Sequence, residues 1–168
     1  MIKQKDLKKA IKLNNIELVR TLLTNEFIDP SQDYNNSIKL SSELGYLDIV
    51  KLLLEDKRVD PSDSRNLAIR LASKNGHFEV VKLLLNDERV NPSDVENRSF
   101  ESASTYGHID IVKLLLKDER VNPSDAENSA IRGASENGQF EVVELLLSDP
   151  RVNPAEYINL AIVSAYKE

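Results

Sequence analysis

The sequence predicts an all-α solenoid of stacked helix–turn–helix repeats. A glycine recurs every 31 residues, at positions 45, 76, 107 and 138, and prolines keep the same step at positions 30, 61, 92, 123 and 154. A period of roughly 20 to 50 residues indicates a stacked array. Each glycine also stands just before a strongly apolar segment, of which FEVVKLLL (78–85) is typical. No such segment can bury its apolar surface alone, so each repeat needs its neighbours.

The composition indicates a folded chain and argues against several classes of function. The 168 residues are 40% apolar and 30% charged, and the net charge of −6 argues against general affinity for nucleic acid or anionic membranes. The absence of cysteine excludes disulfides and thiolate metal sites. No apolar run is long enough to span a bilayer, and the first residues lack the apolar segment of a signal peptide. We therefore expect a cytoplasmic protein.

The repeat step divides the chain into one repeat domain, residues 1–168. Its predicted repeats are 1–33, 34–64, 65–95, 96–126 and 127–157, followed by a half repeat that begins at Ile158 and ends at Glu168. The first repeat diverges from the others in sequence, and its lysine-rich first helix suits a terminal cap. The half repeat is either a lid on repeat five or a bare face that pairs with another chain; we favour the lid.

The first helix of repeat three is predicted to run from Leu67 to Asn75. Asn66 is a good N-cap, because its side-chain oxygen can accept a free amide of the first turn, and Gly76 suits the left-handed position that ends a helix. Asparagine stands at the same place at positions 35, 97, 128 and 159. One face of this helix carries small residues that permit close approach to its neighbours: Ala68, Ile69, Ala72 and Ser73.

The second helix of repeat three covers residues 78–85. Its polar residues, Glu79, Lys82 and Asn86, form one narrow stripe, so the helix must be covered on its other sides. The segment DERVNPSD (87–94) ends it, because proline cannot continue a helix. The loops carry an apolar column at positions 28, 59, 90, 121 and 152, predicted to form a small buried seam. No sheet is required, although two extended residues per loop could form short bridges.

The segment AIRLASKNGHFEVVKLLL (68–85), followed by Arg89-Val90-Asn91, resembles the ankyrin repeat. The resemblance covers essentially the whole chain and implies two antiparallel helices per repeat, a projecting hairpin loop and a protein-binding function. The Arg-Val-Asn-Pro-Ser variant resembles ankyrin-like proteins of amoebal giant viruses and amoeboid protists. This implies a viral or protist source, and the host cytoplasm if viral.

The chain departs from the family pattern in its loops. Leu67 to Arg70 replace the family's Thr-Pro-Leu-His, and Asp87 to Arg89 replace its Gly-Ala-Asp. Each repeat is also two residues shorter. We therefore predict short or rebuilt, proline-stiffened loops in place of hairpin fingers.

The outer face of the first helices carries side chains that differ between repeats. The resemblance implies that such positions line a concave surface and contact partners. Tyr106 is the sharpest candidate, because an exposed aromatic ring offers large contact area at low entropic cost. An alternative is that Arg70, Glu101 and Arg132 bridge one repeat to the next. The candidates are Lys39, Glu43, Arg70, Lys74, Asn75, Glu101, Thr105, Tyr106, Arg132 and Glu136.

Three recurring sets have structural interpretations. His77 and His108 occupy one place in successive repeats, and stacked helices lie about 8 to 10 Å apart, too far for both to bind one metal directly. We predict structural capping. The aspartates at 56, 87, 118 and 149 and the arginines at 58, 89, 120 and 151 are predicted to neutralise one another and fix the loops. Asn91, Asn122 and Asn153 match the Val-Asn of the family, whose asparagine is hydroxylated in some members. Because arginine replaces the acid that usually precedes this motif, we do not expect hydroxylation here.

The function predicted is a non-catalytic protein–protein interaction scaffold. Polar groups recur in columns and do not converge, so we expect no catalytic residue, cofactor or metal site. The expected partner is another protein, not nucleic acid or membrane, and the expected state is a monomer. The alternatives are a structural or self-associating element that uses residues 158–168, and a substrate-targeting adaptor of a ubiquitin ligase.

Overall fold

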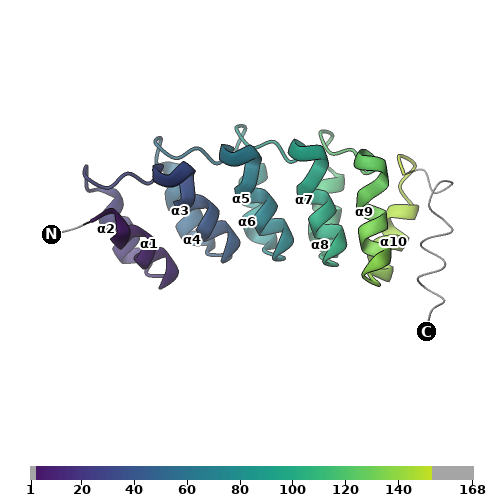
Figure 1. Ribbon diagram of the computed structural model, residues 1–168, viewed down its shortest axis with the longest axis horizontal. Coiled ribbons are helices and arrows are strands. Elements are labelled where there is room, and N and C mark those ends of the chain that lie inside the picture. The colour runs from purple at the N-terminus through teal and green to yellow at the C-terminus, as the bar shows by residue number, and fades with distance from the viewer. Residues whose placement is uncertain (1–2, 153–168) are drawn as a thin grey trace.

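The computed structural model describes residues 3–152, and within that range the chain forms ten helices and no strand. The helices pair into antiparallel hairpins that follow one another in a row from the N-terminal end (Figure 1). The predicted all-α solenoid is confirmed. The predictions that concern residues 153–168, namely the final half repeat and Asn153, lie outside the described residues.

The hairpins form two layers. The first helices are α1 (Gln4–Lys12), α3 (Gln32–Glu43), α5 (Asp63–Lys74), α7 (Asp94–Thr105) and α9 (Asp125–Glu136). The second helices are α2 (Ile16–Leu23), α4 (Leu47–Glu55), α6 (Phe78–Leu85), α8 (Ile109–Leu116) and α10 (Phe140–Leu147). Each helix packs on its hairpin partner and on the corresponding helix of the next hairpin. We call the surface formed by α3, α5, α7 and α9 the first-helix face.

Apolar side chains from both layers of helices and from the loops form the core. In α6, Val80, Val81 and Leu84 are at most 1% exposed, whereas the stripe of Glu79 and Lys82 faces solvent. The small face of α5 is fully buried against its neighbours, as predicted. It consists of Ala68, Ile69, Ala72 and Ser73. The loop column is buried too, with Val59, Val90 and Val121 each 1% exposed. A continuous apolar seam therefore runs along the array.

Gly45, Gly76 and Gly107, which end first helices, are each required for two reasons. Gly76 has a φ of +76°, a left-handed conformation that side chains rarely adopt. A Cβ at this residue would also lie 2.7 Å from Cε1 of His108, whose ring covers the glycine. Nε2 of His108 bonds the carbonyl of Lys74 at 2.9 Å, and His77 bonds that of Glu43 in the same way. The predicted capping role is confirmed: each ring satisfies the end of the preceding repeat's first helix.

The prediction for Asn66 was wrong. Ser64, Arg65 and Asn66 all have left-handed φ values, and the turn is closed by a 2.7 Å bond from the amide of Asn66 to the carbonyl of Ser62. The right-handed part of α5 follows this turn. Because the turn directs the asparagine away from its own helix, its Oδ1 accepts the amide of Asn91 at 2.8 Å and its Nδ2 donates to Asp94 at 2.9 Å. Asn66 therefore ties its repeat to the next.

Asn35 and Asn97 make the same two contacts with the next repeat. Asn35 accepts the amide of Asp60 at 2.7 Å and donates to Asp63 at 2.7 Å. Left-handed residues other than glycine cost about 1–2 kcal/mol each. Val95 is the least suited, because its Cβ is branched and its φ is +54°. Bonds to the neighbouring repeat offset this strain.

The loop arginines also reach the preceding repeat. Arg89 bonds Asp87 twice, Nε to Oδ1 at 2.9 Å and Nη2 to Oδ2 at 2.6 Å, and its Nη1 donates to the carbonyl of Val59 at 2.9 Å. The pairs at 56/58, 118/120 and 149/151 repeat this arrangement. The predicted mutual neutralisation is confirmed. The side-chain hydrogen bond from Arg89 lowers the pKa of Asp87, against the opposing effect of burial.

The predicted rebuilt loops in place of hairpin fingers are confirmed in the described residues. No strand forms in the described loops, and Oδ1 of Asn91 accepts the amide of Ser93 at 3.1 Å, which closes a tight turn around Pro92. The short bridges allowed by the sequence are absent from residues 3–152.

We expect Leu84→Asp to lower the free energy of unfolding by more than about 3 kcal/mol, because it leaves an unpaired charge in the core. Urea unfolding followed by circular dichroism measures this. Lys82→Asp, on the exposed stripe of the same helix, is the control and should change stability by less than about 0.5 kcal/mol. Equal effects would mean that the two faces of α6 are assigned wrongly.

Gly76→Ala and Gly138→Ala separate the two requirements for glycine. Both residues have positive φ, but no described atom lies within 4 Å of a Cβ at Gly138. We expect Gly138→Ala to cost about 1 kcal/mol from backbone strain. Gly76→Ala should cost about 1 kcal/mol more, because it also displaces the hydrogen-bonded ring of His108. Indistinguishable urea midpoints would contradict this role of the histidine.

The four aspartate–arginine pairs predict a dependence of stability on pH. Their aspartates have lowered pKa values in the folded protein. The stabilisation is therefore complete above the ordinary aspartate pKa of about 3.9 and is lost as the pH falls through the lower, folded-state values. Asp87→Asn should be less stable than the wild type at pH 6, and the difference should shrink toward pH 2. Glu88→Gln makes the same change in net charge without breaking this pair, and urea midpoints across this range compare the variants. A difference that is independent of pH would contradict the assignment.

Candidate functional site

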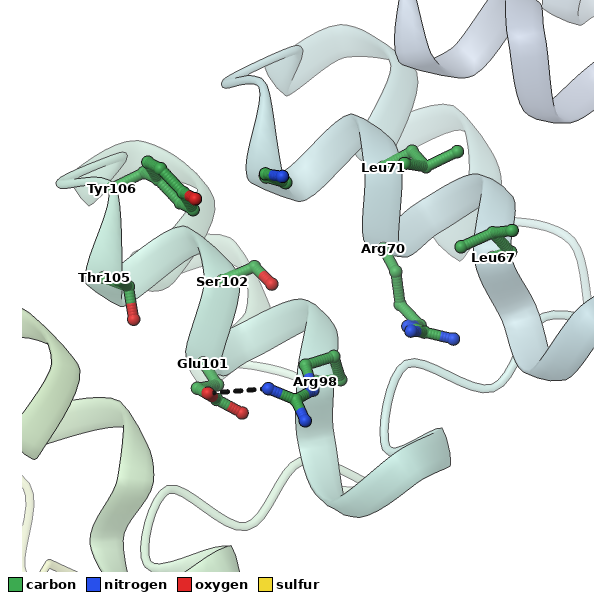
Figure 2. A pocket seen from close by; sticks show the side chains of 9 residues that line it. Leu67, Arg70, Leu71, Arg98, Glu101, Ser102, Thr105 and Tyr106 are labelled. Atoms are coloured by element: carbon green, nitrogen blue, oxygen red, sulfur yellow. Dashed lines mark hydrogen bonds and ion pairs between the residues drawn. The ribbon is translucent and has the colours of Figure 1, made fainter.

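A cavity of about 430 Å³ opens on the first-helix face between α5 and α7 (Figure 2). Both helices contribute side chains spaced three and four residues apart, which places them on one side of each helix. The lining residues are Leu67, Arg70, Leu71 and Lys74 from α5, and Arg98, Glu101, Ser102, Thr105 and Tyr106 from α7. The pocket is therefore a groove between two repeats, closed below by the packed helices.

The size of the residue at one position differs between neighbouring first helices. This position holds Leu71 in α5, Ser102 in α7 and Gly133 in α9. A Cβ on Gly133 would collide with Oγ1 of Thr105, so α9 lies close against α7. Between α5 and α7 the small Ser102 leaves space, and the pocket forms there.

The pocket has an excess of positive charge. Its lining includes three cations, Arg70, Lys74 and Arg98, and one carboxylate, that of Glu101. Nη1 of Arg98 pairs with Glu101 at 2.9 Å, as the dashed line in Figure 2 marks. Arg70 and Lys74 form no ion pair with a described residue. Because an arginine stays charged at neutral pH, Arg70 adds a positive charge to the pocket, which the carboxylate of Asp94 offsets only in part.

Arg70 is also short of hydrogen-bond acceptors. Its Nε is buried without a partner among residues 3–152, and its Nη1 reaches the carbonyl of Arg65 only at 3.4 Å. Figure 2 shows its guanidinium at the same end of the pocket as that of Arg98. Burial, and next the charge of Arg98, lower the pKa of Arg70. Both effects disfavour the charged side chain as it stands, so an anion placed here would stabilise it.

Tyr106 lies at the other end of the pocket, where its ring is fixed by neighbouring side chains but stays exposed. Its side chain is 52% exposed. The ring stacks on that of His108, with centroids 6.5 Å apart and planes at 17°, and Nζ of Lys74 lies 5.6 Å from its centroid. Since His108 is fixed to the carbonyl of Lys74, the tyrosine ring has a rigid support. It can meet a partner with little loss of conformational entropy.

The structure separates the predicted candidates into two groups. Arg70, Lys74, Glu101, Thr105 and Tyr106 come together in the pocket. The other five, Lys39, Glu43, Asn75, Arg132 and Glu136, lie outside its lining.

Contacts between repeats involve only some of these candidates. Lys39 donates to Oγ of Ser64 at 3.0 Å, and Asn75 donates to the carbonyl of Glu43 at 3.1 Å. Arg70 and Glu101 make no hydrogen bond or ion pair to a neighbouring repeat within the described part of the chain. The bridging alternative therefore fits Lys39 and Asn75 better than Arg70 and Glu101.

Four lining residues were missed from the sequence: Leu67, Leu71, Arg98 and Ser102. Arg98 belongs to a column that differs in every repeat and includes Asn36, Leu67 and Ser129. Its spacing of three residues from Glu101 on a helix was a usable signal for a pair on one face.

Two features are absent from the part of the chain that the structure describes. Residues 3–152 contain no group of three or more histidine, aspartate or glutamate side chains arranged to hold a metal ion. None of the helices described is both long and apolar enough to cross a membrane.

Stacked helical hairpins that bury one another and present an open groove define a solenoid repeat protein. The family model described as Ankyrin repeats (3 copies) matches residues 7–94, 41–125 and 69–156, so the chain belongs to the ankyrin-repeat family. No curated protein matches the sequence. The likeness to proteins of amoebal viruses and protists stays a prediction.

Proposed function

We propose that the protein is a non-catalytic interaction module that binds another protein through its first-helix face and loops, with the pocket between α5 and α7 at the centre. Ankyrin repeats generally mediate protein–protein interactions and are a non-enzymatic module. The proposal adds to this family property the location of the contact.

The observation that carries the proposal is Tyr106, a half-exposed aromatic ring fixed beside a pocket. Tyrosine and arginine are the residues that most often dominate binding energy at protein interfaces, where they fill or rim a pocket. Here both types line one groove. The stacking on His108 keeps the ring in place before a partner arrives.

The remaining candidates extend the proposed surface along the array. Lys39, Glu43 and Asn75 continue it toward the N-terminal repeats, and Arg132 and Glu136 continue it on α9. Because exposed charges contribute mainly to specificity and association rate, we propose that these residues select the partner and that the pocket supplies most of the affinity.

The proposal includes a monomeric protein in the cytoplasm, that of the host if the source is viral. A self-associating element would instead show a mass in light scattering that rises with concentration. An adaptor of a ubiquitin ligase is a narrower case of the same proposal, and co-purification of ligase subunits distinguishes it.

We expect Tyr106→Ala to weaken capture of the partner at least tenfold, because truncating a central aromatic residue at an interface typically costs about 2 kcal/mol or more. The free energy of unfolding should change by less than about 1 kcal/mol, since the ring is half exposed. Affinity capture from the native cell with quantitative mass spectrometry, together with urea unfolding, measures both effects.

Phe140→Ala is the matched control, because Phe140 is 65% exposed and lies on α10, outside the first-helix face and the pocket lining. It should leave the captured proteins unchanged. If Tyr106→Ala unfolds the protein, or if both variants capture the same proteins in the same amounts as the wild type, the proposed interface is wrong.

A further inference from the structure

The pocket has the opposite charge to the chain as a whole. The protein carries 28 acidic and 22 basic residues, a net charge of −6. The pocket lining nevertheless contains three cations and one carboxylate. A local excess of positive charge on an acidic protein favours a ligand whose negative charge is concentrated at this place.

Arg70 provides a specific site for such a ligand. Its Nε has no acceptor in the described structure, and its Nη1 has only a distant one. A carboxylate can bind a guanidinium with two parallel hydrogen bonds. Because Nε is closed to solvent, these bonds would come from the two Nη atoms of Arg70, and the carboxylate would separate the charges of Arg70 and Arg98.

Lys74 provides a second cation at a defined spacing. It follows Arg70 by four residues on α5, which corresponds to about 6 Å along a helix axis at about 1.5 Å per residue. In an extended peptide, side chains two residues apart point the same way and lie about 6.6 Å apart. Two acidic side chains separated by one residue would match these two cations.

The volume of the pocket favours an extended ligand. A cavity of about 430 Å³ between two helices can admit side chains and a narrow backbone. A helix with side chains is about 10–12 Å across and does not fit between first helices that are packed against each other. The apolar atoms of Leu67 and Leu71 can cover the side-chain stems of an extended segment.

We propose that the pocket between α5 and α7 recognises an extended acidic segment of the partner, with one carboxylate at Arg70 and a second, two residues away in the segment, at Lys74. This inference rests on the proposed function and names the chemistry of its partner. Glu101 favours carboxylates over a phosphate group, because a phosphate dianion would be repelled more strongly by the pocket's own carboxylate.

The test is selection from a displayed library of random seven-residue peptides on the whole chain, followed by affinity measurements on synthetic copies of the selected peptides. The wild type should enrich sequences with two acidic residues separated by one residue. Fluorescence polarisation should show affinity about tenfold weaker for Arg70→Gln, because the charged hydrogen bonds to the peptide carboxylate are lost. Higher salt should weaken binding.

Matched variants keep the test informative. Lys74→Gln removes the second cation at an exposed position, and Lys113→Gln removes a lysine of α8 that lies outside the pocket. We expect a several-fold loss of affinity for Lys74→Gln and no change for Lys113→Gln. Peptides with glutamine in place of both acids should not bind, and a phosphoserine in place of either acid should not increase affinity.

The remaining outcomes separate this inference from the proposed function. Selected peptides that depend on Tyr106 but lack the acidic pair would overturn the inference and leave the proposed interface standing. Acidic peptides whose affinity is unchanged by Arg70→Gln, or tighter binding of the phosphoserine peptides, would also overturn it. Selection of no peptide would contradict both. Acidic peptides that are weakened by Arg70→Gln but unaffected by Tyr106→Ala would support the inference and contradict the central role of Tyr106 in the proposed function.

Discussion

The contact between one hairpin and the next is the constraint on which the rest of the structure depends. A single pair of helices of eight to twelve residues, such as α5 and α6, has too little apolar surface facing inward to fold alone. Val80, Val81 and Leu84 are buried because neighbouring hairpins cover them. Burial of apolar area supplies most of the favourable free energy of folding, but it does not fix the register of one hairpin on the next. The hydrogen bonds of Asn66, Arg89 and His108 fix it, because each joins two repeats at a single geometry.

The sequence predicts the helices well because their pattern is local. The narrow polar stripe of α6 and the glycine after α5 are visible within one repeat, and both were placed correctly. The role of Asn66 was not predictable in this way. Its partners, the amide of Asn91 and the carboxylate of Asp94, lie 25 and 28 residues further along the chain. The rule for helix caps assigns an asparagine to the nearest free amide, and here a left-handed turn presents it to a different repeat.

The candidate site was predictable in part for a similar reason. The variable face of the first helices can be read from helical spacing, and it includes Arg70, Lys74 and Tyr106. Which groove opens depends on how closely two helices approach. Gly133 permits the contact with Thr105 that closes the next groove, whereas Ser102 leaves space beside α5. That difference of one or two heavy atoms has no periodic signal, so the position of the pocket requires the structure.

The bonds that fix the register also decide which side chains are left for recognition. Asn66 and Asp94 bind each other across a repeat boundary, and His108 binds a backbone carbonyl, so a change in any of them would disturb the stacking. Arg70 makes no contact of this kind in the described chain, and Tyr106 only stacks on the ring of His108. Under the proposed function, substitutions at these two positions alter binding without altering the array. The equivalent positions differ between repeats: Lys39 and Asn75 bond to a neighbouring repeat, whereas Arg70 and Tyr106 do not, and the pocket forms where these two residues lie along α5 and at the end of α7.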